Sequence, residues 1–485
     1  MQATHPRHLV VIGAGLAGLA AAEQALDAGG DRWRVTVVEP AGRAGGVIQT
    51  IRRDGWLVER SADSFLAARP EAVSLVERLG LADQLIGILP RHRRALVLHR
   101  GRPQPVPEGF RLLAPGRLAA ILRTPLLSPL GKMRLMWERC VPSRPAHVTD
   151  ESLQSFAERR LGREAFEALV QPLAAGIWTA DPARLSMAAA CPEFFAMERR
   201  AGSLWAGEQH RLRTTPTGGP AAGARYGQFL SLAEGLDTLP RRLAETLAGR
   251  GARFVTAAAS AVTRRSDGRW SVALAAVAPD AAVPEPLTAD AVVVATPAAR
   301  AQTLLRGHDA ALADAIASIP YAGSAVVSLG FARADVAHPL DAAGMVVPRR
   351  EGRRLLAVSF SSSKFPGRAP DGAVLMRSFV GGALDPEAAT LEDDQLVGLV
   401  LHELRDLLGA VGRPLLVQVD RWHGAMPQYE VGHLEKVARI EHLLAGHVGL
   451  ALAGAAYEGV GIPQTIASGR AAAARVLAFV EKSHG

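Results

Sequence analysis

Two short apolar runs flank a glycine-bearing helical segment near the start of the chain. Residues 8–12 (HLVVI) and 34–39 (RVTVVE) have the length of buried strands. The stretch 13–29 between them begins with glycines and continues with apolar positions at helical spacing. This order predicts a β-α-β unit of about thirty residues.

The next part of the chain has a different pattern. Residues 110–139 are apolar with interspersed Arg, Lys and Pro, and residues 151–175 have helical periodicity. Thr, Pro and Gly are concentrated at 212–224, which predicts a linker. We therefore expect a mainly helical unit ahead of this linker.

A second α/β pattern follows the linker. Residues 235–250 are expected to form a helix, 291–297 (AVVVATP) a strand ending in a turn, and 321–382 several strands. Residues 449–477 return to a strand, a glycine-rich turn and a helix. A chain of 485 residues exceeds one compact core, so at least two domains are expected.

Composition narrows the class of protein and its partners. Apolar residues make up 48% and charged residues 21% of the chain, which is typical of a folded globular protein. The formal net charge of +8 could serve nucleic acid, an anionic membrane surface or a small anion. Neither zinc spacing nor a basic tail accompanies that charge, so we expect no nucleic-acid partner.

Cysteine content and apolar run length bear on cofactor and location. Cys140 and Cys191 lie far apart, which predicts two reduced thiols and no metal cluster. The sequence has no signal-peptide pattern and no apolar run approaching eighteen residues. We expect a cytoplasmic protein that rests on a membrane face without spanning it.

The first chemistry-bearing motif lies at the first predicted strand–helix junction. Gly13 allows a tight turn, Gly15 lets the backbone approach a pyrophosphate, and Gly18 lets helix and strand pack closely. Glu39 ends the next strand, where an acid can meet a ribose hydroxyl. The loop Gly13-Ala14-Gly15-Leu16-Ala17-Gly18 with Glu39 therefore predicts a dinucleotide site, because a helix N-terminus also attracts phosphate.

Two further glycine motifs indicate FAD. Gly42-Arg43-Ala44-Gly45-Gly46 follows Glu39, and this extension resembles the FAD-binding amine-oxidase superfamily. The C-terminal run is Gly454-Ala455-Ala456-Tyr457-Glu458-Gly459-Val460-Gly461-Ile462-Pro463, and in that superfamily it lies under the flavin. Covalent relatives place a Cys here and this chain has none, so the resemblance implies non-covalent FAD.

Within that superfamily the chain resembles the oxygen-dependent protoporphyrinogen oxidases, especially the bacterial members, over nearly its full length. The segments that carry the resemblance are Glu59-Arg60-Ser61-Ala62-Asp63-Ser64-Phe65-Leu66, Gly176-Ile177-Trp178-Thr179-Ala180, Met426-Pro427-Gln428-Tyr429 with Gly432-His433, and Ile462-Pro463 after Tyr457-Glu458-Gly459. Two positions depart from the family pattern. Ser61-Ala62 replaces its usual Gly-Pro, and Ala95 replaces an expected arginine, with Arg94 beside it.

The resemblance implies a reaction and a set of site residues. A porphyrinogen loses six electrons to become a porphyrin, with FAD as the oxidant and dioxygen as the electron acceptor. Gly176 would face the pyrrole N–H groups, Val346 and Phe379 would sandwich the macrocycle, and Arg69, Arg94 or Arg93 would meet a propionate. Besides the glycine loop, Glu39, Arg43, Gly45 and Gly46, the implied FAD contacts are Ser61, Ala62, Asp63, Ser64, Trp422, Gly454, Ala455, Val460, Gly461 and Ile462. No residue is expected to act as a catalyst besides the flavin.

The resemblance also implies a domain plan of class α/β + α+β. A Rossmann-like FAD-binding domain would comprise residues 1–84, 225–300 and 430–485, and a mixed-sheet substrate-binding domain residues 301–429. An inserted helical domain, 85–224, would bind the membrane, with the arginines of 91–145 facing anionic headgroups. The oligomeric state stays open, a homodimer included.

Three alternatives to protoporphyrinogen IX oxidation remain at this point. Coproporphyrinogen III is the nearest, although the segments 196–199 and 379–382 favour protoporphyrinogen. Oxidation of an amine or a carotenoid is the second, and a non-catalytic flavin-loaded membrane partner is the third.

Overall fold

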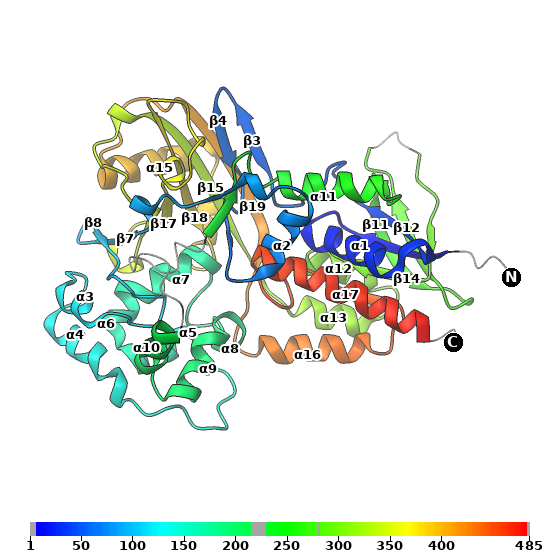
Figure 1. Cartoon of the computed structure of the whole chain (residues 1–485), viewed down its shortest axis with the longest axis horizontal. Helices are drawn as coiled ribbons and strands as arrows, with labels where there is room; N and C mark the ends of the chain where they lie inside the picture. The colour runs from blue at the N-terminus through cyan, green and yellow to red at the C-terminus, as the bar shows by residue number, and fades with distance from the viewer. Residues whose placement is uncertain (1–5, 215–228, 279–281, 483–485) are drawn as a thin grey trace.

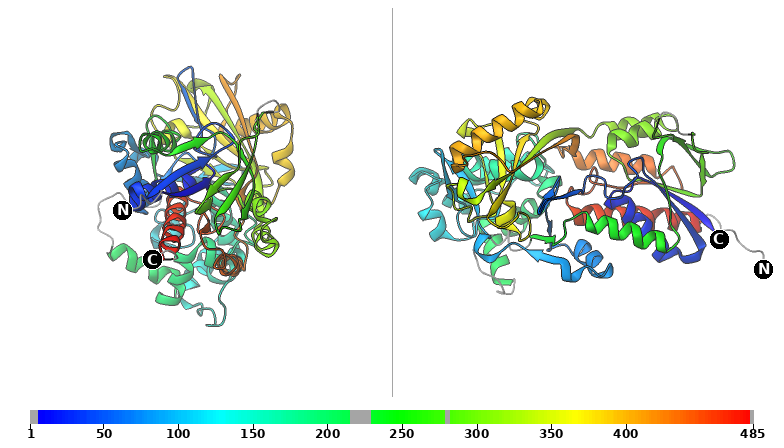
Figure 2. Two further views of the ribbon diagram at one scale, coloured as in Figure 1. Left: turned by 90° about the vertical axis from the view of Figure 1, so that its right-hand side faces the viewer. Right: turned by 90° about the horizontal axis from the view of Figure 1, so that it is seen from above.

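The computed structural model describes residues 6–214, 229–278 and 282–482 (Figure 1). The predicted linker lies outside the described residues from residue 215 onward, as do residues 225–228 of the predicted FAD-binding domain. Within the described ranges, two sheets of different topology form two units, and a group of helices lies beside the second (Figures 1 and 2).

The first unit is built on a five-stranded parallel sheet. Its strand order is β10 (Arg253–Val255), β2 (Trp33–Val38), β1 (Arg7–Ile12), β14 (Ala291–Val294), β20 (Leu450–Leu452). The first predicted β-α-β unit is confirmed as β1, α1 (Leu16–Gly29) and β2. The central strands β1 and β14 are apolar on both faces, as expected of a parallel sheet that is covered on both faces.

Helices from opposite parts of the sequence share one face of this sheet. α1 lies beside α17 (Ile462–Lys482), with α11 (Thr238–Gly249) and α2 (Pro70–Arg78) next to them (Figure 1). A methyl group at Gly469 would overlap the Ala17 carbonyl, so α1 and α17 approach closely only because position 469 carries no side chain.

The other face is covered by a second layer. This layer contains α12 (Ala298–Leu305), α13 (Ala310–Ala317), α16 (His433–Leu444) and the antiparallel strands β11 (Ala258–Arg264), β12 (Trp270–Ala275) and β13 (Leu287–Ala289). Residues 301–319 therefore pack on the parallel sheet, although the sequence placed them with the substrate-binding domain.

The second unit is a seven-stranded mixed sheet. Its order is β19 (Leu416–Pro427), β15 (Tyr321–Ala332), β18 (Ala373–Gly381), β17 (Leu355–Ser359), β16 (Gly344–Val346), β7 (Ala95–His99), β8 (Arg102–Pro105). Helix α15 (Asp393–Leu408) packs on its apolar face. The strands β7 and β8 come from the range 85–224 and add to this sheet. The expectation that residues 85–224 form a helical insertion is therefore wrong for its arginine-rich start.

Small elements connect the two units. They are the hairpin β3 (Thr50–Arg53) and β4 (Trp56–Glu59), the antiparallel strands β5 (Phe65–Leu66), β9 (Phe229–Leu232) and β6 (Leu85–Gly87), and the short helix α14 (Ser361–Lys364). Trp56 and Val58 of the hairpin pack against Leu375 and Leu416 of the mixed sheet.

The helical region has its own apolar core. Its helices are α3 (Leu118–Arg123), α4 (Pro129–Met136), α5 (Leu153–Leu161), α6 (Arg163–Ala165), α7 (Gln171–Trp178), α8 (Met187–Ala190), α9 (Pro192–Ala201) and α10 (Leu204–Thr214), with a π-helical turn at Phe166–Val170. No described helix is both long and apolar enough to cross a bilayer.

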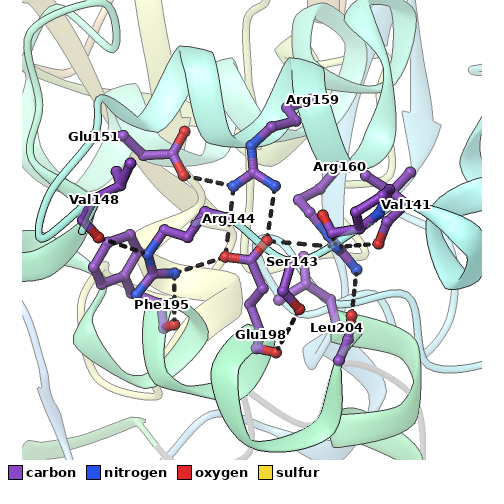
Figure 3. Close-up of polar contacts among 12 residues, drawn as sticks. Val141, Ser143, Arg144, Val148, Glu151, Arg159, Arg160, Phe195, Glu198 and Leu204 are labelled. Atoms are coloured by element: carbon purple, nitrogen blue, oxygen red, sulfur yellow. Dashed lines mark hydrogen bonds and ion pairs between the residues drawn. The ribbon is translucent and has the colours of Figure 1, made fainter. Parts of the chain in front are cut away.

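Several arginines of this region point inward. Glu198 is fully buried and accepts hydrogen bonds from Arg144 at 2.6 Å and from Arg159 at 2.7 Å, with Arg160 at 3.4 Å (Figure 3). Arg111 likewise pairs with Glu193 and the buried Glu208. The expectation that the arginines of 91–145 face lipid headgroups is therefore wrong for Arg111 and Arg144, which balance buried carboxylates.

Candidate active site

The glycine loop after β1 has the geometry that a bound dinucleotide requires. Gly13 has φ +105°, and a methyl group there would come within 2.6 Å of the Ala295 carbonyl oxygen. A methyl at Gly18 would overlap the Gly13 carbonyl. Gly15, the N-cap of α1, instead borders open space, so the first amides of the helix are accessible to a phosphate.

The predicted acid and the second glycine motif lie against this loop. The Glu39 carboxylate accepts the Ala14 N–H at 2.9 Å and the Ala41 N–H at 3.0 Å. Gly45 donates its N–H to the Ala14 carbonyl at 2.8 Å, and a methyl at Gly46 would lie 3.3 Å from the Gly15 Cα. The structure thus brings the two N-terminal motifs together. Arg43 is exposed and donates to the Gly46 carbonyl at 3.0 Å.

Asp63 lies between two cations. Its carboxylate contacts the Lys364 ammonium at 2.9 and 3.0 Å and the Arg377 guanidinium at 3.3 Å, and Ser64 donates to it at 2.8 Å. Burial opposes its ionisation, but the charges of Lys364 and Arg377 outweigh burial and hold the pKa of Asp63 well below its usual range. The cluster is therefore ionised and carries one excess positive charge.

The neighbouring residues of the segment 60–62 are fixed to the mixed sheet and the glycine motif. Arg60 pairs with the buried Asp420 at 2.5 Å, and the Trp422 indole N–H donates to the Arg60 carbonyl at 2.9 Å. The Ser61 hydroxyl donates to the Val47 carbonyl at 2.5 Å, and Arg377 donates to the Ser61 carbonyl. Ser61 and Ala62 thus keep an ordered backbone without the family's Gly-Pro, and Trp422 lies beside that backbone.

The C-terminal glycine turn joins β20 to α17 on the same side of the parallel sheet as α1. Gly454 and Gly459 have φ +127° and +134°, which side chains rarely adopt. Position 454 borders open space, as Gly15 does, while Ala455, Val460 and Gly461 are half-buried. Ile462 opens α17, so its N-terminus lies directly after this turn.

The predicted substrate residues Gly176, Val346 and Phe379 lie on three elements, α7, β16 and β18. A methyl at Gly176, on α7, would lie 3.5 Å from the Val346 side chain, on β16. Val346, Ala357 and Phe379 are register partners on three successive strands, so their side chains share the sheet face opposite α15. Gly176 is exposed, and Val346 and Phe379 are half-buried. The Arg377 guanidinium lies 5.4 Å from the Phe379 ring centre.

The three candidate propionate-binding arginines differ in their exposure and in their hydrogen-bond partners. Arg69 is the exposed N-cap of α2. Arg94 pairs with Asp341, and Arg93 donates to the Ile88 carbonyl at 3.1 Å. Arg94 also lines a cavity of about 330 Å³, with Arg123, Ala95 and Leu173 among the other lining residues. Leu173 is on α7, so this cationic, mostly apolar cavity lies on the helix that carries Gly176.

Sequence reasoning missed Lys364 and Arg377. Both are distant from Asp63 in sequence and meet it only through the mixed sheet. One signal was available for Lys364: the chain contains only four lysines among its 55 basic residues, and this one follows three serines.

The comparisons with known proteins agree with this geometry. The model of the flavin containing amine oxidoreductase family matches residues 16–477. A coproporphyrinogen III oxidase of Propionibacterium freudenreichii subsp. freudenreichii is 36% identical over 97% of this chain and 90% of its own. Another, of Bacillus subtilis (strain 168), is 32% identical over 98% of both chains. The chloroplastic protoporphyrinogen oxidase of Nicotiana tabacum is 31% identical over 98% of this chain and 86% of its own.

A solved structure gives the same result for the fold. The structure from Exiguobacterium sp. 255-15, provisionally named a protoporphyrinogen oxidase, has a TM-score of 0.83 at 30% identity and covers 98% of this chain and 99% of that one. The chain belongs to the flavin containing amine oxidoreductase family. It is a flavin-dependent oxidoreductase, and its cofactor is FAD.

The described residues fit that cofactor. Gly15, at the N-terminal end of α1, and Gly454, in the turn between β20 and α17, leave room where a side chain would stand. Helix N-termini attract phosphates and electron-rich ring edges. Neither cysteine lies at the C-terminal turn, because Cys140 and Cys191 are both in the helical region.

Proposed function

We propose that this protein oxidises a porphyrinogen to the porphyrin, with protoporphyrinogen IX as the substrate and dioxygen as the electron acceptor. The placement of Gly176 against Val346, which shares one sheet face with Phe379, carries the proposal, because it brings an accessible backbone and two apolar side chains together in a chain of this family. The macrocycle loses six electrons and six protons, and three dioxygen molecules take them up as hydrogen peroxide.

The chain's own residues would bind and orient the macrocycle. Bound FAD supplies the two-electron oxidant. The exposed Gly176 backbone carries no side chain that would keep the ring away, and Val346 and Phe379 cover its faces. Arg123 lines the cavity beside α7 and offers a cation to a propionate, whereas the Arg94 guanidinium at the same cavity is paired with Asp341.

Coproporphyrinogen III is the second candidate substrate. Two of the relatives named above are coproporphyrinogen III oxidases, at 36% and 32% identity. The segments that favoured protoporphyrinogen have structural reasons of their own: Glu198 is a buried partner of arginines, and a methyl at Gly382 would lie 2.8 Å from the Thr179 carbonyl oxygen.

Contact with the cytoplasmic membrane belongs to the same proposal. Five large apolar side chains are exposed on α3, α4 and the turn after α4, and we call them the apolar patch: Leu118, Leu122, Leu130, Met133 and Trp137. The exposed Arg117 and Arg123 and the half-buried Lys132 lie on or next to the same elements. An apolar patch with cations around it is typical of a surface that rests on anionic lipid.

Anaerobic reduction tests the function. Protoporphyrinogen IX added without oxygen should bleach the visible absorption band of bound FAD. Readmitted oxygen should restore the band and produce porphyrin fluorescence. The ratio of kcat/KM for protoporphyrinogen IX and coproporphyrinogen III then identifies the substrate. An FAD-loaded protein that neither porphyrinogen reduces would contradict the proposal.

A further inference from the structure

The segment Pro427–His433 is among the most diagnostic of the family resemblance, yet the function proposed above gives it no role. Its central residue, Tyr429, is 3% exposed and belongs to the core of the helical region. Its hydroxyl nevertheless reaches the C-terminal glycine turn. The Tyr429 hydroxyl donates to the Ala455 carbonyl at 2.6 Å and accepts the Gly459 N–H at 2.7 Å.

Those two hydrogen bonds link Ala455 and Gly459 of the turn through a side chain from another segment of the chain. A tyrosine hydroxyl has one proton to donate and can also accept, so a single side chain satisfies two backbone groups four residues apart. Burial raises the pKa of Tyr429, which keeps the hydroxyl protonated and able to donate. Gly454 and Gly459 both have positive φ, and the Tyr457 N–H reaches the Gly454 carbonyl only at 3.5 Å. Tyr429 therefore supplies two of the side-chain hydrogen bonds that shape the turn, beside the Ser468 hydroxyl, which accepts the Gly454 N–H at 3.1 Å.

The phenol ring is itself held in place. The His433 ring stacks on it with centres 3.9 Å apart and planes inclined by 14°, and the His433 imidazole contacts the Tyr457 carbonyl at 3.4 Å. Burial lowers the pKa of His433 to about 4, so the imidazole is neutral at physiological pH. A neutral ring can stack there without a buried charge.

The same segment is fixed to the substrate side of the molecule. The Gln428 amide donates to the Trp178 carbonyl at 3.4 Å, at the end of α7, two residues after Gly176. The Tyr429 carbonyl accepts the Ser186 N–H at 2.7 Å, and the Gln428 N–H donates to the Pro320 carbonyl at 2.8 Å. Residues 428–433 thus connect α7 with the turn 454–461.

We infer that Tyr429 is a positioning residue that fixes the glycine turn 454–461, which would help to hold FAD, and couples this turn to the helix that carries Gly176. The inference needs FAD, which family membership establishes, and does not need a porphyrinogen. If the porphyrinogen experiment fails, the inference about Tyr429 is still decided by its own test.

Tyr429→Phe tests the inference, with Tyr321→Phe as the matched control. The Tyr321 hydroxyl accepts the Ala298 N–H at 3.0 Å, so each variant deletes one hydroxyl that bonds to backbone. FAD is titrated into FAD-free protein, and the visible spectrum and reduction potential of the bound flavin are recorded. Tyr429→Phe should raise the Kd for FAD about tenfold and shift spectrum and potential, because two bonds at the turn are lost.

The control separates positioning from stability. Tyr321→Phe should also lower the thermal midpoint, yet leave the Kd for FAD within about twofold of the natural chain, because its bond is at α12. Unchanged FAD binding and an unchanged spectrum in Tyr429→Phe would overturn the inference. So would equal weakening of FAD binding in both variants.

A measurement on the natural chain keeps the inference testable if Tyr429→Phe does not fold. In the FAD-free protein the Gly459 amide should be protected from hydrogen exchange at least about tenfold, because it donates to the phenol. Exchange at the rate of an unstructured peptide would overturn the inference.

Discussion

At the scale of single residues, the site depends on a carboxylate placed between two cations. Asp63 is 14% exposed in its side chain, and Lys364 and Arg377 are 11% and 1% exposed, so water screens these charges poorly. A buried charge is tolerated only with partners that also satisfy its hydrogen bonds. Lys364 makes two of the contacts to Asp63, which makes it the main partner.

Replacement of Lys364 by Met should destabilise the fold. We expect a loss of about 1.5–3 kcal/mol in the free energy of unfolding, because Asp63 loses charge-assisted bonds while Arg377 remains. Chemical denaturation measures it. Lys436→Met is the control, since the half-buried Lys436 donates to the uncharged Ser318 carbonyl and should contribute within about 0.5 kcal/mol. Equal stability of the two variants would contradict the assigned role of Lys364.

Part of the site could be predicted from single residues, and part could not. The glycines and Glu39 were predictable because each answers a local requirement of a strand–helix turn. Lys364 and Arg377 were not, because their role depends on sheet register that joins residues about three hundred positions apart. Arg94 was a propionate candidate by position alone, and the structure adds an acidic partner, Asp341.

At the scale of elements, the helical region is held by charges as well as by apolar packing. Glu198 of α9 joins Arg159 and Arg160 of α5 to Arg144 of the preceding loop (Figure 3). Burial opposes ionisation of Glu198, but hydrogen bonds and charge from Arg159 and Arg144 outweigh it and lower the pKa of this carboxyl.

Glu198→Gln should loosen α5 and α9. We expect a loss of about 3–5 kcal/mol, because three cations lose their common carboxylate. Faster hydrogen exchange of the α5 and α9 amides measures it. The control is Glu167→Gln, which removes an exposed pair with Arg163. Since the pKa of Glu198 is lower in the folded state, the difference from the natural chain should persist above about pH 4.3 and decrease as the pH falls further.

A difference in stability that stays constant down to about pH 2, through the range over which carboxyls titrate, would contradict this account. So would equal exchange rates in Glu198→Gln and Glu167→Gln.

The order of the elements was largely readable from periodicity, whereas their partners were not. The strand at 291–297 and the final strand–turn–helix follow the predicted pattern as β14, β20 and α17. β7 and β8 were assigned to a helical unit because neighbouring prolines and arginines dominate the local pattern. Strand pairing with β16 decides their place, and that pairing joins residues far apart in sequence.

At the scale of the whole molecule, the apolar patch is the surface feature that the fold itself does not explain. Leu130, Met133 and Trp137 are 73%, 58% and 63% exposed. Each large apolar side chain that leaves water contributes about 1.5–3 kcal/mol when fully buried, so three can hold a protein on a bilayer together with nearby cations.

Replacing Leu130, Met133 and Trp137 together by Ser should weaken binding to vesicles that contain phosphatidylglycerol at least about tenfold. Co-sedimentation measures the bound fraction. The control replaces Val411, Leu415 and Val417, which are exposed near the start of β19, by Ser. If both triple variants bind vesicles like the natural chain, the patch does not rest on lipid.

The closeness of α1 and α17 has a consequence for how the protein is made. Arg470 of α17 pairs with Glu23 of α1, 447 positions earlier in the sequence. During synthesis, the first strand and helix leave the ribosome long before the helix that completes their surroundings. The apolar face of α1 that α17 covers therefore stays exposed until the C-terminal helix has been synthesised. Because the turn before α17 is also made late, we expect FAD to bind only near the end of translation.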